Sequence, residues 1–393
     1  MDLSKMTEYD LICELEALAL SHRHLPYAVT SPREKLSFDD QTSRVNLLFF
    51  SDSHLDYRNP EASLDNVRRT VELANRYPVP FDAVVHAGDI ITPFGIRPKS
   101  EALALAEPFF ELARQSRAPF VFAKGNHDLN DWGNLPENVL TDANWGRLFY
   151  DFAEEQYGIV REKKKNGEKS TWHYLDLEER RIRIVSLDVQ DTDKTSLNDQ
   201  GTVRFYGGGS IYFSNEQINW VVSEALCFDG KENPDWGVIF VFHNTSCGKP
   251  IVHDDAVEKL IGICAAFNAA GKYENEYRHP EYPFFDWSVS ADFTRYAVLE
   301  RRPHIICFLL GHLHVDQHLV REGIHLIWTL NGSATTASSD ARVARILDTA
   351  TQNAFDIVNI DTLHRRIRLF RYGAGQNCYG EGGDRFLPEG IAY

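Results

Sequence analysis

VNLLFFSDSH, residues 45–54, is an almost unbroken apolar run that ends in polar side chains. Continuous apolar residues rich in β-branched and aromatic types are typical of a strand that is covered on both faces. We therefore expect a buried strand over residues 45–50, with Asp52 and His54 just beyond its carboxyl end. In extended backbone, residues at i and i+2 point to the same side, so these two side chains could meet one metal ion.

Two more apolar runs follow, and each also leads into polar side chains. AVVHA, residues 83–87, leads to Asp89, and PFVFA, residues 119–123, leads to the sequence GNHD. The segments between the runs, residues 63–77 and 101–115, have helical character. This βαβαβ succession predicts parallel strands, and the ligand site of an open α/β sheet lies beyond the carboxyl ends of its strands.

Two later apolar runs end in histidines. VIFVF, residues 238–242, precedes His243, and IICFLL, residues 305–310, precedes the sequence GHLH, which contains His312 and His314. Imidazole, carboxylate and amide ligands suit Mn, Fe and Zn ions, and no cysteine takes part, which disfavours a soft thiolate site. Five strand ends therefore predict a site for two divalent metal ions, which can clamp the attacking and leaving oxygens of an in-line displacement.

The formal charge of such a site favours an anionic phosphoester. Two divalent ions would carry a larger charge than Asp52 and Asp89 neutralise, so the inner shell is left at about +2. A solvent molecule that bridges the ions should lose a proton near neutral pH, because a single catalytic Zn already lowers the pKa of water to about 7. We expect that hydroxide to be the nucleophile.

Five sequence blocks occur in order from residue 52 to residue 314. They are DSH, GD, GNHD, a lone histidine and GHLH, at residues 52–54, 88–89, 125–128, 243 and 311–314. In this order they resemble the blocks of calcineurin-like metallophosphoesterases. The resemblance implies a four-layer αββα sandwich of the α/β class, with two mixed sheets and a dinuclear metal site at the carboxyl ends of the strands. Candidate strands of the second sheet are HLIWTL, AFDIVNID and RIRLFRY, residues 325–330, 354–361 and 366–372.

The resemblance also implies a role for each site residue. The residues implied for the first ion are Asp52, His54 and His314, and those for the second are Asn126, His243 and His312. Asp89 would bridge the two ions. His127 would lie beside the metals as a general acid that protonates or hydrogen-bonds the leaving oxygen. Asp128 would either orient His127 or cap the chain at the surface.

Two blocks depart from the pattern of phosphoprotein phosphatases in the same superfamily. Those enzymes read GDxVDRG and GNHE, whereas this chain reads GDIITPFG, residues 88–95, and GNHD. Thr92 stands where their acidic residue would be. Protein phosphatase activity is therefore disfavoured, and the pattern instead resembles that of bacterial and phage-borne phosphoesterases.

The composition of the chain limits the kinds of substrate and partner that we expect. The net charge of −16 over 393 residues argues against a broad grip on duplex nucleic acid, which calls for a basic face, so a small phosphoester or nucleotide is the expected substrate. No signal peptide is evident, and no apolar run reaches the roughly 18 residues of a membrane span. We expect a cytoplasmic protein without membrane contact. A phage-derived origin is compatible with the resemblance, and the sequence does not define protein partners.

The spacing of the blocks predicts one catalytic domain, residues 44–393. Residues 1–43 are expected to form an appendage, with a helix at Glu8–Leu20 and a proline-containing linker. Insertions near residues 158–180 and 247–300 are expected to form loops that could shape substrate choice.

Two local patterns within or near these insertions favour simple structural readings. REKKKNGEK, residues 161–169, indicates an exposed hairpin or loop more than an anion site. Gly207–Gly209 lacks the Lys and Ser/Thr of a phosphate-binding loop and indicates a flexible turn beside the site.

Three functions are compatible with the sequence. The first is a dinuclear metal-dependent hydrolase of small or nucleotide-like phosphomonoesters or phosphodiesters. The second is a metallonuclease that acts on single strands or ends, and the third is a non-catalytic structural or binding module that retains the fold. We favour the first, an enzyme, because every predicted ligand and His127 are present.

Overall fold

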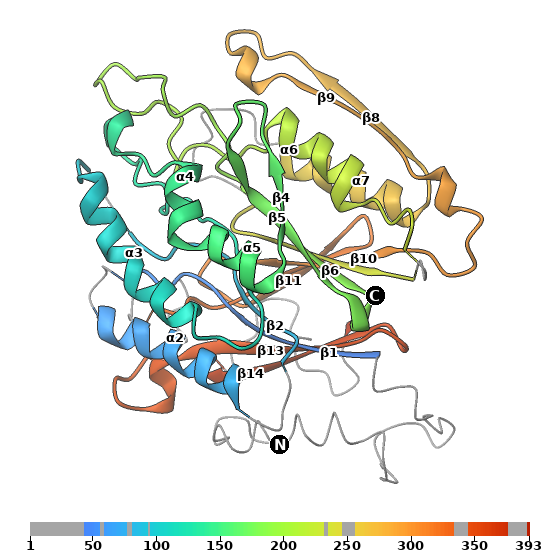
Figure 1. Cartoon of the computed structure of the whole chain (residues 1–393), viewed down its shortest axis with the longest axis horizontal. Coiled ribbons are helices and arrows are strands. Elements are labelled where there is room, and N and C mark those ends of the chain that lie inside the picture. Colours follow the sequence, from blue (N-terminus) through green and yellow to red (C-terminus); the bar gives the residue numbers. More distant parts are fainter. Residues whose placement is uncertain are drawn as a thin grey trace.

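The computed structural model of the protein describes residues 43–55, 59–76, 81–92, 95–231, 235–245, 256–333, 345–375 and 391–393 (Figure 1). The helix expected at Glu8–Leu20 and the linker after it lie outside these residues. Two large mixed sheets form the centre of the described part of the protein, and helices flank them. The predicted α/β class with two mixed sheets is confirmed.

Three parallel strands form the part of the first sheet that leads to the site. They are β1 (Arg44–Phe50), β2 (Ala83–His86) and β3 (Phe120–Phe122), and β2 pairs with both of the others. The connecting helices are α2 (Pro60–Asn75) and α3 (Lys99–Ala113). The predicted βαβαβ unit is therefore confirmed, and all three strands are fully buried, as their apolar runs indicated.

Three carboxyl-terminal strands complete the first sheet, which has the order β15-β14-β13-β1-β2-β3. They are β13 (Ala354–Asp361), β14 (Arg366–Gly373) and β15 (Ile391–Ala392). The expectation that β13 and β14 belong to the second sheet is wrong. β13 pairs antiparallel with β1, because β1 is buried and the backbone groups on its second edge need partners that β2 cannot supply.

The second sheet has four parallel strands at its centre, β12, β10, β7 and β6, and antiparallel strands at both edges. In spatial order its strands are β11 (Gln317–Arg321), β12 (Ile324–Trp328), β10 (His304–Leu310), β7 (Gly237–Phe242), β6 (Ile182–Ser186), β5 (Lys169–Leu177) and β4 (Val160–Lys163). The placement of residues 325–328 in this sheet is therefore confirmed, and the strand ends before Thr329.

The second sheet separates two hydrophobic cores. Ile239 and Val241 of β7 belong to the core shared with the first sheet, α2 and α3. Val238, Phe240 and Phe242 of the same strand belong to the core under α7 (Ala256–Asn268). Because side chains alternate along a strand, one sheet can serve both cores, and helix, sheet, sheet and helix form four layers (Figure 1).

Shorter helices flank the sheets. They are α4 (Asp142–Trp145), α5 (Asp151–Tyr157) and α6 (Asn215–Trp220), with π-helical segments at Gly146–Tyr150 and Val221–Ala225. Within the described ranges, every helix is too short or too polar to cross a lipid bilayer.

Both predicted insertions contain strands. The lysine-rich segment forms the β4–β5 hairpin, with an exposed turn in which Gly167 has a φ of 89°, so the hairpin interpretation is confirmed. The described part of residues 247–300 contains α7 and a two-stranded sheet of β8 (Lys272–Tyr277) and β9 (Trp287–Asp292). The expectation of loops is wrong for residues 272–277 and 287–292, which pair as strands with Trp287 buried in the second core, whereas the connecting residues 278–286 do form a loop with one short 3-10 turn.

A buried arginine connects the two sheets beside the carboxyl end of β10. Arg371 of β14 is fully buried, and its guanidinium donates to Asp356 of the first sheet at 2.8 Å and to Asp316, beyond β10, at 2.6 Å. It also donates to Thr329 at 3.2 Å. Burial alone would lower the pKa of Arg371, but the two carboxylates raise it well above its ordinary value. The group therefore stays charged inside the fold.

We expect Arg371→Ala to lower the free energy of unfolding by about 3–5 kcal/mol, because it leaves two buried carboxylates without their cation. Urea unfolding followed by circular dichroism measures this change. Arg301→Ala is the matched control, since the Arg301 side chain is 70% exposed, and it should change stability far less. Equal effects of the two substitutions would contradict a stabilising role for the buried network.

Candidate metal centre

The chain turns as soon as β1 ends. Asp52 and His54 have φ angles of 56° and 43°, so the expectation of extended backbone at these residues is wrong. Their backbone N–H groups donate to the carbonyls of Gly88 and Asp89, at 2.8 and 3.1 Å, which ties this loop to the loop after β2. The two side chains still meet, but they do so through a left-handed turn held by the neighbouring loop.

Five of the seven predicted ligands share this uncommon backbone conformation. The five, with positive φ, are Asp52, His54, Asp89, His312 and His314. Non-glycine residues in sparsely populated backbone regions cost about 1–3 kcal/mol each and cluster at functional sites. The strain is concentrated at the residues that the sequence identified as ligands.

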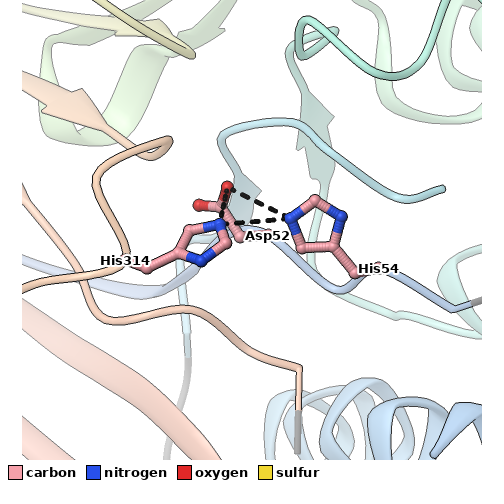
Figure 2. Close-up of side chains that lie close together, drawn as sticks. All are labelled: Asp52, His54 and His314. Atoms are coloured by element: carbon pink, nitrogen blue, oxygen red, sulfur yellow. Dashed lines mark hydrogen bonds and ion pairs between the residues drawn. The ribbon is translucent and has the colours of Figure 1, made fainter. Parts of the chain in front are cut away.

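One group of ligand atoms gathers around Asp52. Its members are Asp52, His54 and His314, whose ligand atoms all lie within 4.8 Å of one another. His314 Nε2 is 3.0 Å from Asp52 Oδ1 and 3.1 Å from His54 Nε2 (Figure 2). Two imidazoles and a carboxylate so close together form a donor set that a transition-metal ion or Zn can use.

A second group gathers around Asp89. Its members are Asp89, His243 and His312, again within 4.8 Å of one another. His243 Nδ1 donates to the carbonyl oxygen of Ala87 at 2.7 Å, which leaves Nε2 facing Asp89 Oδ2 at 3.0 Å. A ligating histidine is oriented in the same way, by a hydrogen bond from its other ring nitrogen.

Asn126 lies next to this second group. Its side-chain oxygen is buried and accepts no hydrogen bond from the residues that the structure describes, although buried polar atoms are normally paired. The backbone N–H of the following residue, His127, donates to Asp89 Oδ1 at 2.9 Å. A buried, unsatisfied amide oxygen on the residue before His127 fits the donor set expected for a divalent cation.

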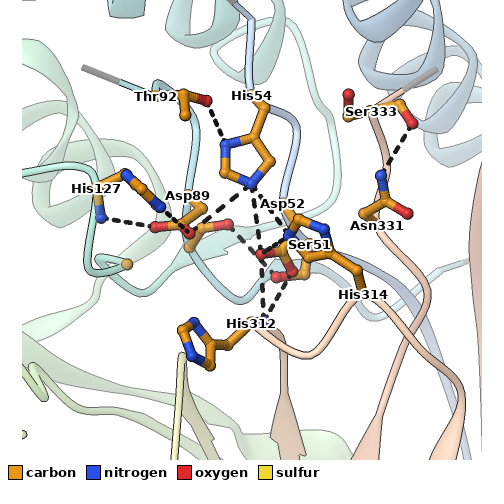
Figure 3. Close-up of polar contacts among 12 residues, drawn as sticks. Ser51, Asp52, His54, Asp89, Thr92, His127, His312, His314, Asn331 and Ser333 are labelled. Carbon is orange, nitrogen blue, oxygen red and sulfur yellow. Dashed lines mark hydrogen bonds and ion pairs between the residues drawn. The ribbon is translucent and has the colours of Figure 1, made fainter. Parts of the chain in front are cut away.

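Asp89 lies between the two groups. Its Oδ2 atom is 3.0 Å from His243 Nε2 in the second group. The same atom is 3.8 Å from His54 Nε2 in the first group (Figure 3). His127 Nε2 lies 3.9 Å from the same oxygen. The structure thus brings all six predicted carboxylate and imidazole ligands into two adjoining groups, with His127 at their margin.

The electrostatics keep both carboxylates ionised. Burial alone would raise the pKa of Asp52, but His314 and His243 outweigh it and lower the pKa below its ordinary value. The same balance, with His243 and His127, holds the pKa of Asp89 well below its usual range. Burial lowers the pKa of His54 and of His312 to about 4, so these imidazoles are neutral and offer lone pairs near pH 7.

Asp128 lies in the interior of the protein, next to the loops that carry the ligands, and not at the surface. It is completely buried, so the surface-cap alternative is wrong. Its carboxylate accepts hydrogen bonds from the backbone N–H groups of Gly125, Asp89 and Ile90, at 2.7 to 2.9 Å. Burial, and then the charge of Asp89, raise the pKa of Asp128 to about 7. Asp128 therefore ties the loop after β3 to the loop after β2.

Sequence reasoning missed several supporting contacts. Thr92 Oγ1 lies 2.5 Å from His54 Nδ1, and Ser53 Oγ lies 3.0 Å from His86 Nε2. Ser53 gave no local signal, and Thr92 was noted only as a departure from the phosphoprotein phosphatase pattern. Arg371 did give one: it shares the inward phase of β14 with Ile367 and Leu369, where an apolar residue is expected.

Comparison with known proteins places the chain among phosphoesterases. The family model of calcineurin-like phosphoesterases matches residues 45–316. Among solved structures, the chain is similar to the phosphopantetheinyl hydrolase of Mycobacterium tuberculosis, with 14% identity, a TM-score of 0.35 and coverage of 74% of this chain and 91% of that one. It is also similar to the NAD nucleotidase of Haemophilus influenzae, with 13% identity, a TM-score of 0.37 and coverage of 81% of this chain and 47% of that one. A further similar structure is a 5′-nucleotidase described as putative from Staphylococcus aureus, with 10% identity, a TM-score of 0.39 and coverage of 84% of this chain and 54% of that one. No curated protein matches the chain.

Gly125→Ala should reduce metal content, because a Cβ at this position would lie 2.1 Å from Asp89 Oδ1 and displace that carboxylate. Elemental analysis of the purified variant after metal loading measures the effect. Gly271→Ala is the matched control, since the nearest atom to its Cβ would be 3.7 Å away. Full metal content in Gly125→Ala would show that Asp89 does not need its observed position.

Metal affinity should increase with pH up to about 9, because a histidine must lose its proton to bind a cation. Burial alone would lower the pKa of His243, but Asp89 and Asp52 raise it to about 9 in the metal-free chain. Below that pH a cation must displace the proton, so affinity should fall as pH falls. Calorimetric titration in buffers of different ionisation enthalpy counts the released protons, and affinity independent of pH between 7 and 9 would contradict the assignment.

Proposed function

The chain belongs to the calcineurin-like phosphoesterase family and is a metallophosphoesterase, and we propose that it hydrolyses a small or nucleotide-like phosphomonoester or phosphodiester at two divalent cations. One observation carries the proposal: two groups of ligand atoms lie side by side, and the buried carboxylate of Asp89 lies between them.

The proposed site uses seven ligands from five strand ends. Asp52, His54 and His314 would hold one cation, Asn126, His243 and His312 the other, and Asp89 both. Their nitrogen and oxygen donors suit Mn, Fe or Zn. Support comes from the orientation of His243 through its Ala87 bond and from the unsatisfied oxygen of Asn126.

When bound, two divalent cations supply charge neutralisation for a phosphoryl group and lower the pKa of water. The protein's own residues fix that chemistry in place. Backbone N–H groups of His312 and His127 donate to Asp52 and Asp89, at 2.9 Å each, so neither carboxylate can rotate freely. This preorganisation supports catalysis that proceeds mainly by positioning and electrostatics.

His127 is proposed as the group that donates a proton or hydrogen bond to the leaving oxygen. Its side chain is 12% exposed and lies at the margin of the two ligand groups, in contact with Asp89 but outside both groups. Burial lowers the pKa of His127. An imidazole beside the two ligand groups, yet in neither of them, would be available for proton transfer when cations are bound.

The substrate is proposed to be small. A net charge of −16 repels a long polyanion, whereas a local excess of positive charge at two cations attracts a single phosphate group. Duplex nucleic acid is therefore disfavoured as a substrate.

We expect Asp89→Asn and His243→Ala to lower metal content, because each removes a direct ligand. His127→Ala should keep both metals and lower kcat for an ester of phenol, a poor leaving group, by about 10²-fold or more, the contribution typical of general acid catalysis. Elemental analysis and steady-state kinetics on one preparation separate the two effects. His364→Ala, in the β13–β14 turn at the opposite end of the first sheet, is the matched control.

The substrate class is tested with 4-nitrophenyl phosphate, bis(4-nitrophenyl) phosphate, cyclic nucleotides and labelled oligonucleotides, each with Mn, Fe or Zn. Hydrolysis of the small esters supports the proposal. Cleavage of oligonucleotides alone would favour a nuclease, and no turnover in any arm by protein with two bound metals would favour a binding module.

A further inference from the structure

Three aromatic rings are layered at the margin of the site. The ring centroids of His127 and Trp132 are 4.7 Å apart with an interplanar angle of 35°, and those of Trp132 and Tyr206 are 5.7 Å apart at 24°. Trp132 and Tyr206 are half-buried. The imidazole proposed to act on the leaving group therefore packs against an indole that is itself backed by a phenol ring.

The loop that carries Tyr206 is fixed tightly to the loop that carries His127. Asp131 is buried and accepts hydrogen bonds from the backbone N–H of Gly207, at 3.1 Å, and from Lys194 Nζ, at 2.7 Å. Lys194 Nζ also donates to the Phe205 carbonyl at 2.8 Å. This ion pair joins residues 194–207 to the segment just beyond His127.

Two glycines allow the close approach of these loops. A Cβ on Gly207 would lie 2.0 Å from the backbone oxygen of Asn126, and one on Gly208 would lie 2.4 Å from the Trp132 ring. The interpretation of Gly207–Gly209 as a flexible turn is therefore incomplete. The run does lie beside the site, but its glycines serve close packing against the loop of His127 and the indole of Trp132.

We propose that Trp132, supported by Tyr206, is a positioning residue that holds the His127 imidazole in the orientation needed to reach the leaving oxygen. The inference rests on the proposed role of His127. A bound ion would hold a ligating histidine, whereas His127 lies outside both ligand groups, so the orientation of its ring depends on its packing contacts. The Trp132 ring covers His127 and limits its rotation away from Asp89, whose Oδ2 atom is 3.9 Å from Nε2.

The proposal predicts a dependence on the leaving group. An ester of 4-nitrophenol departs with little help from an acid, whereas an ester of phenol needs a proton or hydrogen bond on its leaving oxygen. Trp132→Ala should lower kcat for the phenyl ester by about tenfold or more, since misplacing a reacting group by about 1 Å can cost about 10²-fold. The same substitution should leave kcat for the 4-nitrophenyl ester within about threefold of wild type, with metal content unchanged.

Conservative and control variants separate positioning from general damage. Trp132→Phe keeps a flat ring and should recover most of the phenyl-ester activity. Tyr206→Ala should show a weaker form of the Trp132→Ala defect, because it removes only the backing ring. Leu197→Ala, 46% exposed in the same loop, should behave like wild type with both esters. If Trp132→Ala does not fold, Trp132→Leu is measured in its place.

The possible results distinguish this inference from the proposed function. If wild type hydrolyses both esters, and His127→Ala is selectively slow on the phenyl ester while the Trp132 variants are not, the positioning role is wrong and His127 keeps its assignment. Equal slowing of both esters in Trp132→Ala also overturns it. If His127→Ala shows no leaving-group selectivity, or wild type hydrolyses neither ester, the proposed role of His127 fails and this inference fails with it.

Discussion

Two buried carboxylates, Asp52 and Asp89, set the constraint on which the rest of this structure depends. Neither is accessible to water, and moving an ion out of water costs several kcal/mol unless partners replace its hydration. Here the partners are imidazoles and backbone N–H groups from both sheets. Because these partners come from strand ends far apart in the sequence, the carboxylates can be stable only in the complete sandwich.

The sandwich architecture follows from this requirement. Asp52, Asp89 and Asn126 follow strands of the first sheet, whereas His243, His312 and His314 follow strands of the second. Parallel strands bring their carboxyl ends to one edge, and packing two such sheets face to face brings two edges together. The backbone strain in the left-handed turns at the ligands is the local free-energy cost of bending the chain inward just after each strand.

Much of this arrangement could be predicted from the sequence, because continuous apolar runs mark the buried strands. The strands before Asp52, Asp89, Asn126, His243 and His312 are buried runs with polar residues after them, and a strand that is buried on both faces is recognisable by its continuous apolar residues.

The sheet that β13 joins was not predictable in the same way, since periodicity shows which residues are buried but not which sheet edge a strand pairs with. The conformation at Asp52 and His54 also escaped prediction, because bonds to a neighbouring loop determine it. Trp132 gave no pattern at all, as stacking across loops has no fixed spacing.

Hydrophobic packing alone would not hold the two halves of the site in register. Apolar contact is non-directional, so the shared core favours close approach of the sheets without fixing their relative shift. Two buried ion pairs between the sheets provide directional contacts that apolar packing lacks. Lys124, after β3, lies 2.6 Å from Asp188, after β6, and Arg371 of β14 lies 2.6 Å from Asp316, after β10.

These pairs lie close in sequence to the proposed ligands, since Lys124 is two residues before Asn126 and Asp316 is two residues after His314. Both join the first sheet to the second. Buried ion pairs often add little net stability compared with apolar side chains, but their geometry is strict. Their position beside the ligands therefore argues that they fix the register between the sheets, which a site built from both sheets requires and a hydrophobic core does not supply.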